Sequence, residues 1–286
     1  IEKNFIYQSG ALDLLGFNYK HEDYKDFPVR FKGQKILASE SVSALETRGH
    51  YDFPADVTKM WPPKHGAPCD GNADWTVSAF DNVASYWGTT HEANWKTIKK
   101  QEFMAGTFIW TGFDYLGEPD PYPYPARSSY FGISDLAGFP KDVYYMYQSE
   151  WTTKPVLHLF PHWNWQKDQE VDVWAYYNNA DEVELFLNGK SLGKKSKQND
   201  DLHIAWKVKF EPGTLKAISR KDGKVVLEKE IHTAGQASKI DLKADKASIK
   251  NDGYDLVYVT VSVVDKDGNL IPNANDLINF EVTGGG

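Results

Sequence analysis

The sequence predicts a multidomain chain in which an α/β part with a parallel sheet is followed by antiparallel β-sandwich domains. Up to residue 155, short apolar runs of strand length alternate with helical patterns, as in parallel sheets that helices cover on both faces. Beyond residue 165 the hydrophobic period changes to two, and Asn-Gly and Asp-Gly pairs separate the alternating segments. Short strands joined by such turns indicate immunoglobulin-like sandwiches.

Three apolar runs supply the predicted strands of the α/β part: residues 11–19, 35–40 and 103–110. Between the last two, residues 75–100 have apolar side chains at helical spacing, so we expect a helix that Gly88 interrupts and that resumes at residues 92–100. Residues 141–150 predict a closing helix with Pro140 at or near its start, because proline fits the first turn of a helix. These elements make up a predicted first domain, residues 1–155.

The second predicted domain, residues 156–235, is one immunoglobulin-like sandwich. Apolar side chains alternate with other residues along positions 171–176, and turns are predicted at Asn188-Gly189 and Asp222-Gly223. Residues 235–238 form a predicted linker to the next domain.

The third predicted domain, residues 236–286, starts a second immunoglobulin-like sandwich. Alternating apolar residues at 240–242, 257–263 and 278–282 predict its strands, with a turn at Asp267-Gly268. It has about 50 residues, whereas a complete domain of this kind takes about 100. We therefore expect that the chain, which ends at Gly284-Gly285-Gly286, contains only part of this domain.

Composition excludes several classes of partner and cofactor. The net charge of −8 argues against nucleic acid, since phosphate contacts need clustered Lys and Arg. No stretch reaches the ~18 apolar residues of a membrane span. A single cysteine, Cys69, excludes an intrachain disulfide and a cysteine metal cluster, and no cofactor is predicted.

No metal site is predicted either. His158 and His162 have the i, i+4 spacing of a helical metal pair, but Pro161 argues against a helix there, so we expect structural histidines near the domain junction. Eight of the ten tryptophans fall within residues 61–165. This enrichment fits either a sugar-binding cleft or a core of large aromatic side chains.

Glu40 is the first candidate for chemistry. It ends an apolar strand run, where side chains of α/β proteins enter the active site. A carboxylate at such a position is costly to bury unless its charge is used or paired. The alternative is an ion pair with Arg48 or a solvated loop carboxylate.

Two further polar and aromatic clusters follow predicted strands. Residues 110–119 bring Trp110, two carboxylates and two glycines together, and Asn18-Tyr19 ends the first strand. Each has a structural alternative, namely a Gly-rich turn with solvated acids and a buried tyrosine. Three such clusters at three successive strand ends together favour a functional site.

These segments resemble bacterial β-galactosidases of glycoside hydrolase family 2, and the match runs in order from residue 11 to residue 165. The segments are residues 16–20 (GFNYK), 36–40 (ILASE), 48–49 (RG), 110–119 (WTGFDYLGEP), 129–133 (SYFGI) and 161–165 (PHWNW). The resemblance implies that residues 1–155 are the last third of a catalytic (β/α)8 TIM barrel, with strands similar to the sixth, seventh and eighth. The immunoglobulin-like sandwich domains follow this partial barrel.

The same resemblance assigns roles to individual residues. Glu40 matches the catalytic nucleophile, and Tyr19 matches a tyrosine whose hydroxyl contacts it. The positions implied to bind substrate are Asn18, Tyr19, Trp110, Asp114 and Glu118. A periplasmic or extracellular location is also implied.

The implied activity is that of a retaining β-glycosidase, which hydrolyses terminal β-galactosides through a covalent glycosyl-enzyme. In this family the acid/base is the Glu of an Asn-Glu pair that ends the fourth barrel strand. No Asn-Glu pair occurs in the 286 residues. We therefore expect the upstream part of the same polypeptide to supply the acid/base, and this chain alone to be inactive.

Three alternatives stay open, the last of them a polysaccharide-active relative that acts on sulfated or algal galactans. A β-glucuronidase or β-mannosidase of the same family is the first, although the Asn-x-Lys-Gly pattern expected of a glucuronidase is replaced by residues 128–132 (SSYFG), with Arg127 nearby. The second is a non-catalytic module whose sandwiches bind carbohydrate or are structural. For that role Trp174 and Tyr176 would form an exposed aromatic face, while Trp206 is expected in the core.

Overall fold

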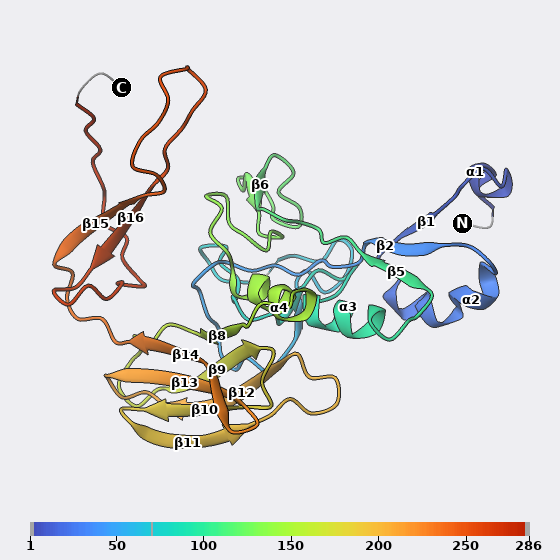
Figure 1. The fold of residues 1–286 in the computed structure, drawn as a ribbon. Coiled ribbons are helices and arrows are strands. Elements are labelled where there is room, and N and C mark those ends of the chain that lie inside the picture. The colour runs from blue at the N-terminus through green and yellow to red at the C-terminus, as the bar shows by residue number, and fades with distance from the viewer. Residues whose placement is uncertain (1–2, 70, 284–286) are drawn as a thin grey trace.

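The computed structural model describes residues 3–69 and 71–283 (Figure 1). Its α/β part contains a parallel sheet in the order β1-β2-β5, as predicted. The strands are β1 (Leu15–Asn18), β2 (Ile36–Glu40) and β5 (Met104–Thr107). Each predicted apolar run therefore contains one strand.

One face of this sheet is covered, whereas we expected cover on both. Leu15, Phe17 and Ile36 pack against the short helices η1 (His21–Asp26) and α2 (Phe27–Arg30). Alternate residues on the other face, such as Asn18, are exposed. Within the described residues the sheet is thus buried on one side. A short helix, α1 (Phe5–Gln8), precedes it.

The predicted helix over residues 75–100 is present only in its second piece, α3 (His91–Ile98). Residues 75–90 instead form turns and the short strand β4 (Val83–Ala84), which pairs in parallel with β3 (Lys59–Met60). Val77 and Phe80 are buried in two different hydrophobic clusters, so their spacing reflects separate burial sites and not one face of a helix. The closing helix, α4 (Asp142–Trp151), is confirmed and begins two residues after Pro140.

The next part is an antiparallel two-sheet sandwich. One sheet has the order β12-β9-β8 and the other β11-β10-β13-β14, with core side chains contributed by both. The strands are β8 (Leu157–Phe160), β9 (Glu170–Tyr177), β10 (Glu182–Leu187), β11 (Lys190–Lys195), β12 (His203–Lys209), β13 (Thr214–Lys221) and β14 (Lys224–His232). Positive φ angles at Asn188-Gly189 and Asp222-Gly223 confirm both predicted hairpin turns. Trp206 lies in the core, as expected.

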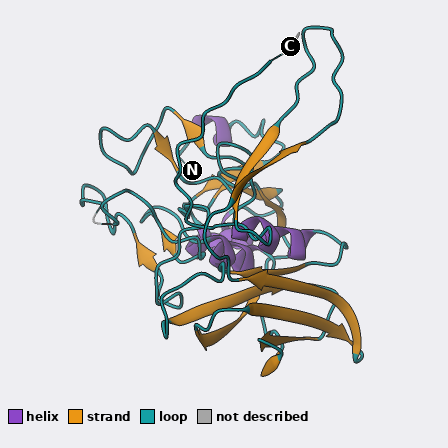
Figure 2. Ribbon diagram, turned by 90° about the vertical axis from the view of Figure 1, so that its left-hand side faces the viewer, coloured by secondary structure: helices purple, strands orange, loops and turns teal. Residues whose placement is uncertain are grey.

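The aromatic residues of β9 do not form the exposed face that a carbohydrate-binding role would need. Trp174 and Tyr176 are 6% and 1% exposed. Trp174 packs on Phe80 with ring centroids 5.0 Å apart, and Tyr176 stacks on Phe160 at 5.2 Å. These side chains are buried because α4 and the segment around Phe80 cover this sheet, and Figure 2 shows the helices lying directly against the sandwich strands. The α/β part and the sandwich thus share one aromatic core.

His158 and His162 lie at this junction, on and just after β8, as expected of structural histidines. His158 Nε2 is 2.6 Å from Asp142 Oδ1 at the start of α4. His162 stacks on Trp165, with centroids 4.4 Å apart. Neither residue is part of a helix.

The last described segment is a hairpin of β15 (Lys239–Ala244) and β16 (Val259–Val264). It extends away from the sandwich (Figure 1). Residues 278–282, expected as a strand, form none, and Phe280 is 73% exposed because nothing described packs on it. The predicted end at Gly284–Gly286 lies outside the described residues. No helix among the described residues is long and apolar enough to cross a bilayer.

Candidate active site

The carboxylate of Glu40 lies at the carboxyl end of β2 and accepts a hydrogen bond from Tyr19. The Tyr19 hydroxyl donates to Glu40 Oε2 at 2.7 Å, and its backbone N–H donates to the Glu40 carbonyl. The register between β1 and β2 shifts at Asn18, which pairs with Glu40, and Tyr19 then adopts a left-handed φ of 53°. This local irregularity brings Tyr19 beside Glu40.

The electrostatics of this pair keep Tyr19 a hydrogen-bond donor. Burial, together with the hydrogen bond to Glu40, raises the pKa of Tyr19 well above its usual value. The hydroxyl therefore keeps its proton and remains a donor. Arg48, the alternative partner of Glu40, instead pairs with Asp135 at 2.6 Å and lies over the Phe139 ring. No ion pair of Glu40 occurs among residues 3–69 and 71–283.

Glu40 lines a pocket of about 300 Å³ whose other lining residues are mostly aromatic or acidic. The lining residues are Tyr19, Glu40, Trp87, Trp110, Tyr115, Glu118, Asp120 and Phe131. Trp110 follows β5 and meets the Tyr115 ring edge-on, with centroids 5.9 Å apart. Tyr115 belongs to β6 (Tyr115–Leu116), which pairs with β7 (Ser128–Ser129). The Trp110-Thr111 peptide is cis.

Four of the six predicted site residues line this pocket: Tyr19, Glu40, Trp110 and Glu118. Asn18 does not line it. The Asn18 Oδ1 atom accepts a hydrogen bond from Ser39 Oγ at 2.8 Å, so this side chain joins β1 to β2 at the same strand end.

Asp114 is also outside the pocket lining, which gives no support to its predicted role as a sugar ligand. Its Oδ1 atom accepts from Lys141 Nζ and from the Gly132 backbone N–H, each at 2.8 Å. Burial raises the pKa of Asp114, and the Lys141 ammonium opposes that rise. A Cβ at Gly132 would lie 2.1 Å from the Asp114 nitrogen, so only glycine allows this approach. We assign Asp114 a structural role.

Sequence reasoning missed Trp87, Tyr115, Asp120 and Phe131. Helical spacing predicts Trp87 on a helix, but its real position depends on Gly88. A Cβ at Gly88 would lie 2.6 Å from Ser43 Oγ and 3.0 Å from the Ser41 carbonyl oxygen. The absence of a side chain lets the chain at Trp87 pack against the segment that follows Glu40. A Trp-Gly pair is a weak signal for such packing. The other three lie in or next to motifs already singled out.

A larger cavity, of about 690 Å³, lies between α3 and the sandwich. Several of its charged side chains pair with one another: Glu92 lies 2.6 Å from His203 and 3.3 Å from Lys96, and Lys207 lies 3.6 Å from Asp172. The His203 ring stacks on Trp174 with centroids 3.7 Å apart. We interpret this cavity as part of the domain contact, because its lining comes from both α3 and the sandwich strands.

Comparisons with known proteins agree with a glycosidase. Residues 240–286 match the family described as glycoside hydrolase family 2 C-terminal domain 5, and residues 168–227 match a domain of unknown function, DUF4982. A Bacteroides ovatus protein named β-galactosidase BoGH2A is 54% identical over 99% of this chain and 33% of its own length. A Formosa agariphila protein named putative β-glucuronidase is 39% identical over 66% of this chain and 19% of its own length.

Among solved structures, a β-glycosidase from Bacteroides vulgatus superposes with a TM-score of 0.78 and 31% identity. The match covers 91% of this chain and 36% of that one. The sequence and the fold therefore match those of glycoside hydrolases. More specifically, the chain belongs to glycoside hydrolase family 2, and it spans about a third of the length of the B. ovatus relative.

Proposed function

We propose that the protein containing this chain is a retaining β-glycosidase that hydrolyses terminal β-galactosides, with Glu40 as its nucleophile. The observation that carries this proposal is the position of Glu40. Its carboxylate ends a parallel strand, faces a pocket lined by Trp110, accepts a hydrogen bond from Tyr19 and has no ion pair among the described residues. An unpaired but hydrogen-bonded carboxylate is what attack on an anomeric carbon requires.

The proposed architecture follows from the same strands. We propose that residues 1–155 are the last third of a (β/α)8 barrel, with β1, β2 and β5 corresponding to its sixth, seventh and eighth strands. Their parallel order and the site at their carboxyl ends support this. Residues 156–235 would be an immunoglobulin-like domain, and residues 236–286 the start of a second one.

In the proposed mechanism, a Glu40 oxygen attacks C1 of the galactoside and forms a glycosyl ester. The bond from C1 to the leaving oxygen breaks, and that oxygen takes a proton from a second carboxylic acid. The same group then removes a proton from water, which attacks C1 and releases Glu40. We propose that this acid/base lies upstream of Ile1 in the polypeptide, roughly 5–5.5 Å from Glu40. The chain alone would then be inactive.

A neutral sugar fits the described part of the pocket better than a uronate. A carboxylated sugar calls for Lys or Arg, and no lining residue in the described part of the chain is either. Glu118 and Asp120 would instead repel it and accept hydrogen bonds from sugar hydroxyls. The relative named β-galactosidase also matches more of this chain, at higher identity, than the relative named putative β-glucuronidase. β-Glucuronidase and β-mannosidase remain the alternative activities.

Covalent trapping tests the nucleophile and the sugar together. The full-length enzyme would be incubated separately with 2-deoxy-2-fluoro β-galactosyl, β-glucuronyl and β-mannosyl fluorides, then digested and mapped by mass spectrometry. We expect the galactosyl reagent to inactivate fastest and to modify the peptide at Glu40. A label on another carboxylate would disprove the nucleophile assignment, and faster inactivation by either other reagent would disprove the sugar assignment.

Replacing Tyr19 with Phe removes the donor to Glu40 and should lower kcat/KM for an aryl β-galactoside. A hydrogen bond to a charged group contributes about 1.5–3 kcal/mol, which corresponds to a loss of roughly 10- to 100-fold. Steady-state kinetics of the full-length enzyme would measure it, with Tyr254→Phe as the matched control because Tyr254 is 89% exposed. Equal kinetics in the two variants would show that the contact does not contribute to the reaction.

A further inference from the structure

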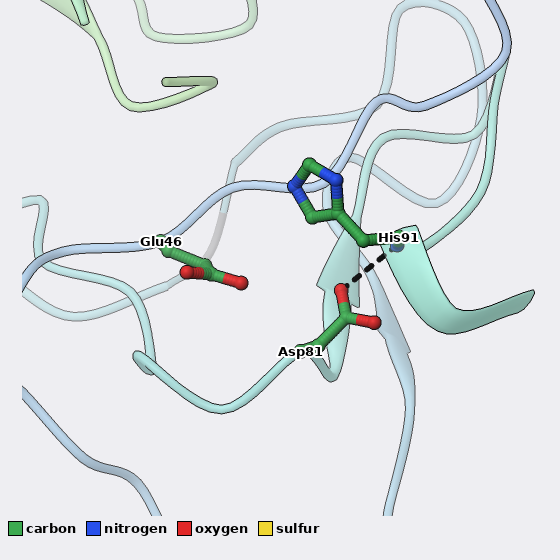
Figure 3. Close-up of side chains that lie close together, drawn as sticks. All are labelled: Glu46, Asp81 and His91. Atoms are coloured by element: carbon green, nitrogen blue, oxygen red, sulfur yellow. Dashed lines mark hydrogen bonds between the residues drawn. The ribbon is translucent and has the colours of Figure 1, made fainter. Parts of the chain in front are cut away.

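A second group of chemically active side chains lies outside the Glu40 pocket. Glu46 follows β2, Asp81 precedes β4 and His91 opens α3, so three separate segments meet here (Figure 3). One oxygen or nitrogen atom from each residue lies within 4.8 Å of the others. All three residues are buried, with exposures of 1%, 7% and 1%.

Glu46 is the unexplained member of this group. Both of its carboxylate oxygens are shielded from solvent and have no hydrogen-bond partner. Figure 3 shows this carboxylate pointing toward Asp81 and the ring of His91. An unpartnered buried carboxylate is costly, so native proteins pair such groups or use them to coordinate metals.

Asp81 and His91 are held firmly, as metal ligands are. The Asp81 carboxylate accepts the backbone N–H groups of His91 at 2.9 Å and Glu92 at 2.7 Å. His91 Nδ1 is 2.9 Å from the Tyr147 hydroxyl. When Nδ1–H donates to that oxygen, the lone pair of Nε2 is free for a metal. Such a hydrogen bond at the other ring nitrogen accompanies most histidine ligands.

The local charges favour a cation. Lys141 is the cation near Glu46, but its ammonium donates to the Asp114 carboxylate and to the Glu46 and Tyr130 carbonyl oxygens. The carboxylates of Glu46 and Asp81 therefore have no counter-ion of their own among the described residues.

We propose that Glu46, Asp81 and His91 bind one divalent transition-metal cation, with Zn²⁺ as the best match. Two carboxylates and one neutral imidazole balance a charge of two, and this mixed oxygen and nitrogen set suits Zn²⁺ better than Ca²⁺ or Mg²⁺. Zn²⁺ binds such ligands at about 2.0–2.2 Å, so atoms within 4.8 Å of one another need little movement to share it.

The role of this cation is structural. The three ligands are buried, and the site ties the segment after β2 to the start of α3. Glu46 lies six positions after Glu40, so the cation fixes the path of the chain that leaves Glu40. The test of this site is independent of the proposed activity, because it measures metal content and stability and not turnover.

The test uses the full-length protein, dialysed against Zn²⁺ and then against metal-free buffer, with zinc measured by mass spectrometry. We expect about one Zn²⁺ per chain in the wild type, and more than about a tenfold loss in Glu46→Gln. Glu102→Gln is the control, because Glu102 is exposed and should leave the zinc content unchanged. A chelator should lower the melting temperature of the wild type and of the control, but not that of Glu46→Gln.

Two results would overturn the proposal: a wild-type protein that retains no Zn²⁺, or equal zinc in the wild type and Glu46→Gln. A shared proton between Glu46 and Asp81 would produce the first result, together with a melting temperature insensitive to chelator. Should Glu46→Gln fail to fold, wild-type crystals soaked in Zn²⁺ decide the matter. Anomalous scattering at the zinc edge must then give a peak between the three side chains, and its absence disproves the site.

Discussion

Replacing Glu40 with Gln in the full-length enzyme is expected to lower kcat for an aryl β-galactoside by at least about 10⁴-fold, because an amide cannot form the glycosyl ester. Gln has nearly the same shape, and its carbonyl oxygen can still accept the Tyr19 hydrogen bond. The fold should therefore persist, with an unchanged circular dichroism spectrum and melting temperature. Initial rates measured at saturating substrate give the comparison.

Two controls sharpen this experiment. Glu102→Gln alters an exposed carboxylate and should keep wild-type rates. Glu40→Ala leaves space beside C1, so added azide should restore turnover and yield the α-galactosyl azide, the product of a single displacement. Retention of more than about a hundredth of wild-type kcat by Glu40→Gln would remove Glu40 from the mechanism. Turnover by residues 1–286 alone, lost in Glu40→Gln, would show that the acid/base had been misplaced upstream.

Replacing Lys141 with Met is expected to destabilise the protein by about 3–5 kcal/mol, because it leaves the Asp114 carboxylate buried without its partner. The Lys141 side chain is fully buried, and its ammonium donates to Asp114 and to two carbonyl oxygens. Burial lowers the pKa of Lys141, and the Asp114 carboxylate partly offsets this. Chemical denaturation followed by tryptophan fluorescence should show a lower midpoint.

Lys194→Met is the matched control for this loss. Lys194 pairs with Glu182 at 2.6 Å, a similar distance, but its side chain is 51% exposed. Solvent screens that pair, so its removal should cost less than about 1 kcal/mol. Adding Asp114→Asn to Lys141→Met should recover part of the stability by removing the unpaired charge. Equal midpoints for the two lysine variants would contradict a structural role for the buried pair.

Much of the fold can be predicted because hydrophobic periodicity reports burial directly. The three apolar runs contain β1, β2 and β5, and the Asn-Gly and Asp-Gly pairs mark hairpin turns in the sandwich. The place of Glu40 at a strand end also follows from sequence, since the apolar run stops there. Its contact with Tyr19 does not follow from periodicity, because it needs the register shift at Asn18.

The features that could not be predicted depend on contacts between distant segments. Residues 75–87 have helical spacing, yet Val77 and Phe80 enter different clusters, which one-dimensional spacing cannot distinguish. Asp114 stands in a motif full of functional residue types, and only the approach of Lys141, 27 positions later, identifies its structural role. Glu46, Asp81 and His91 have no metal-ligand spacing in sequence, because folding alone assembles them.

The burial of Trp174 and Tyr176 has a consequence for exchanging the sandwich domain of this chain. These rings form one continuous hydrophobic layer with Phe80 and Phe160. Neither the α/β part nor the sandwich alone would therefore have a polar surface there. Cutting the chain between α4 and β8 would expose both halves of that layer to water, an aggregation hazard. A sandwich transplanted into another protein would therefore need the loop around Phe80 as well, because that loop covers the Trp174 ring.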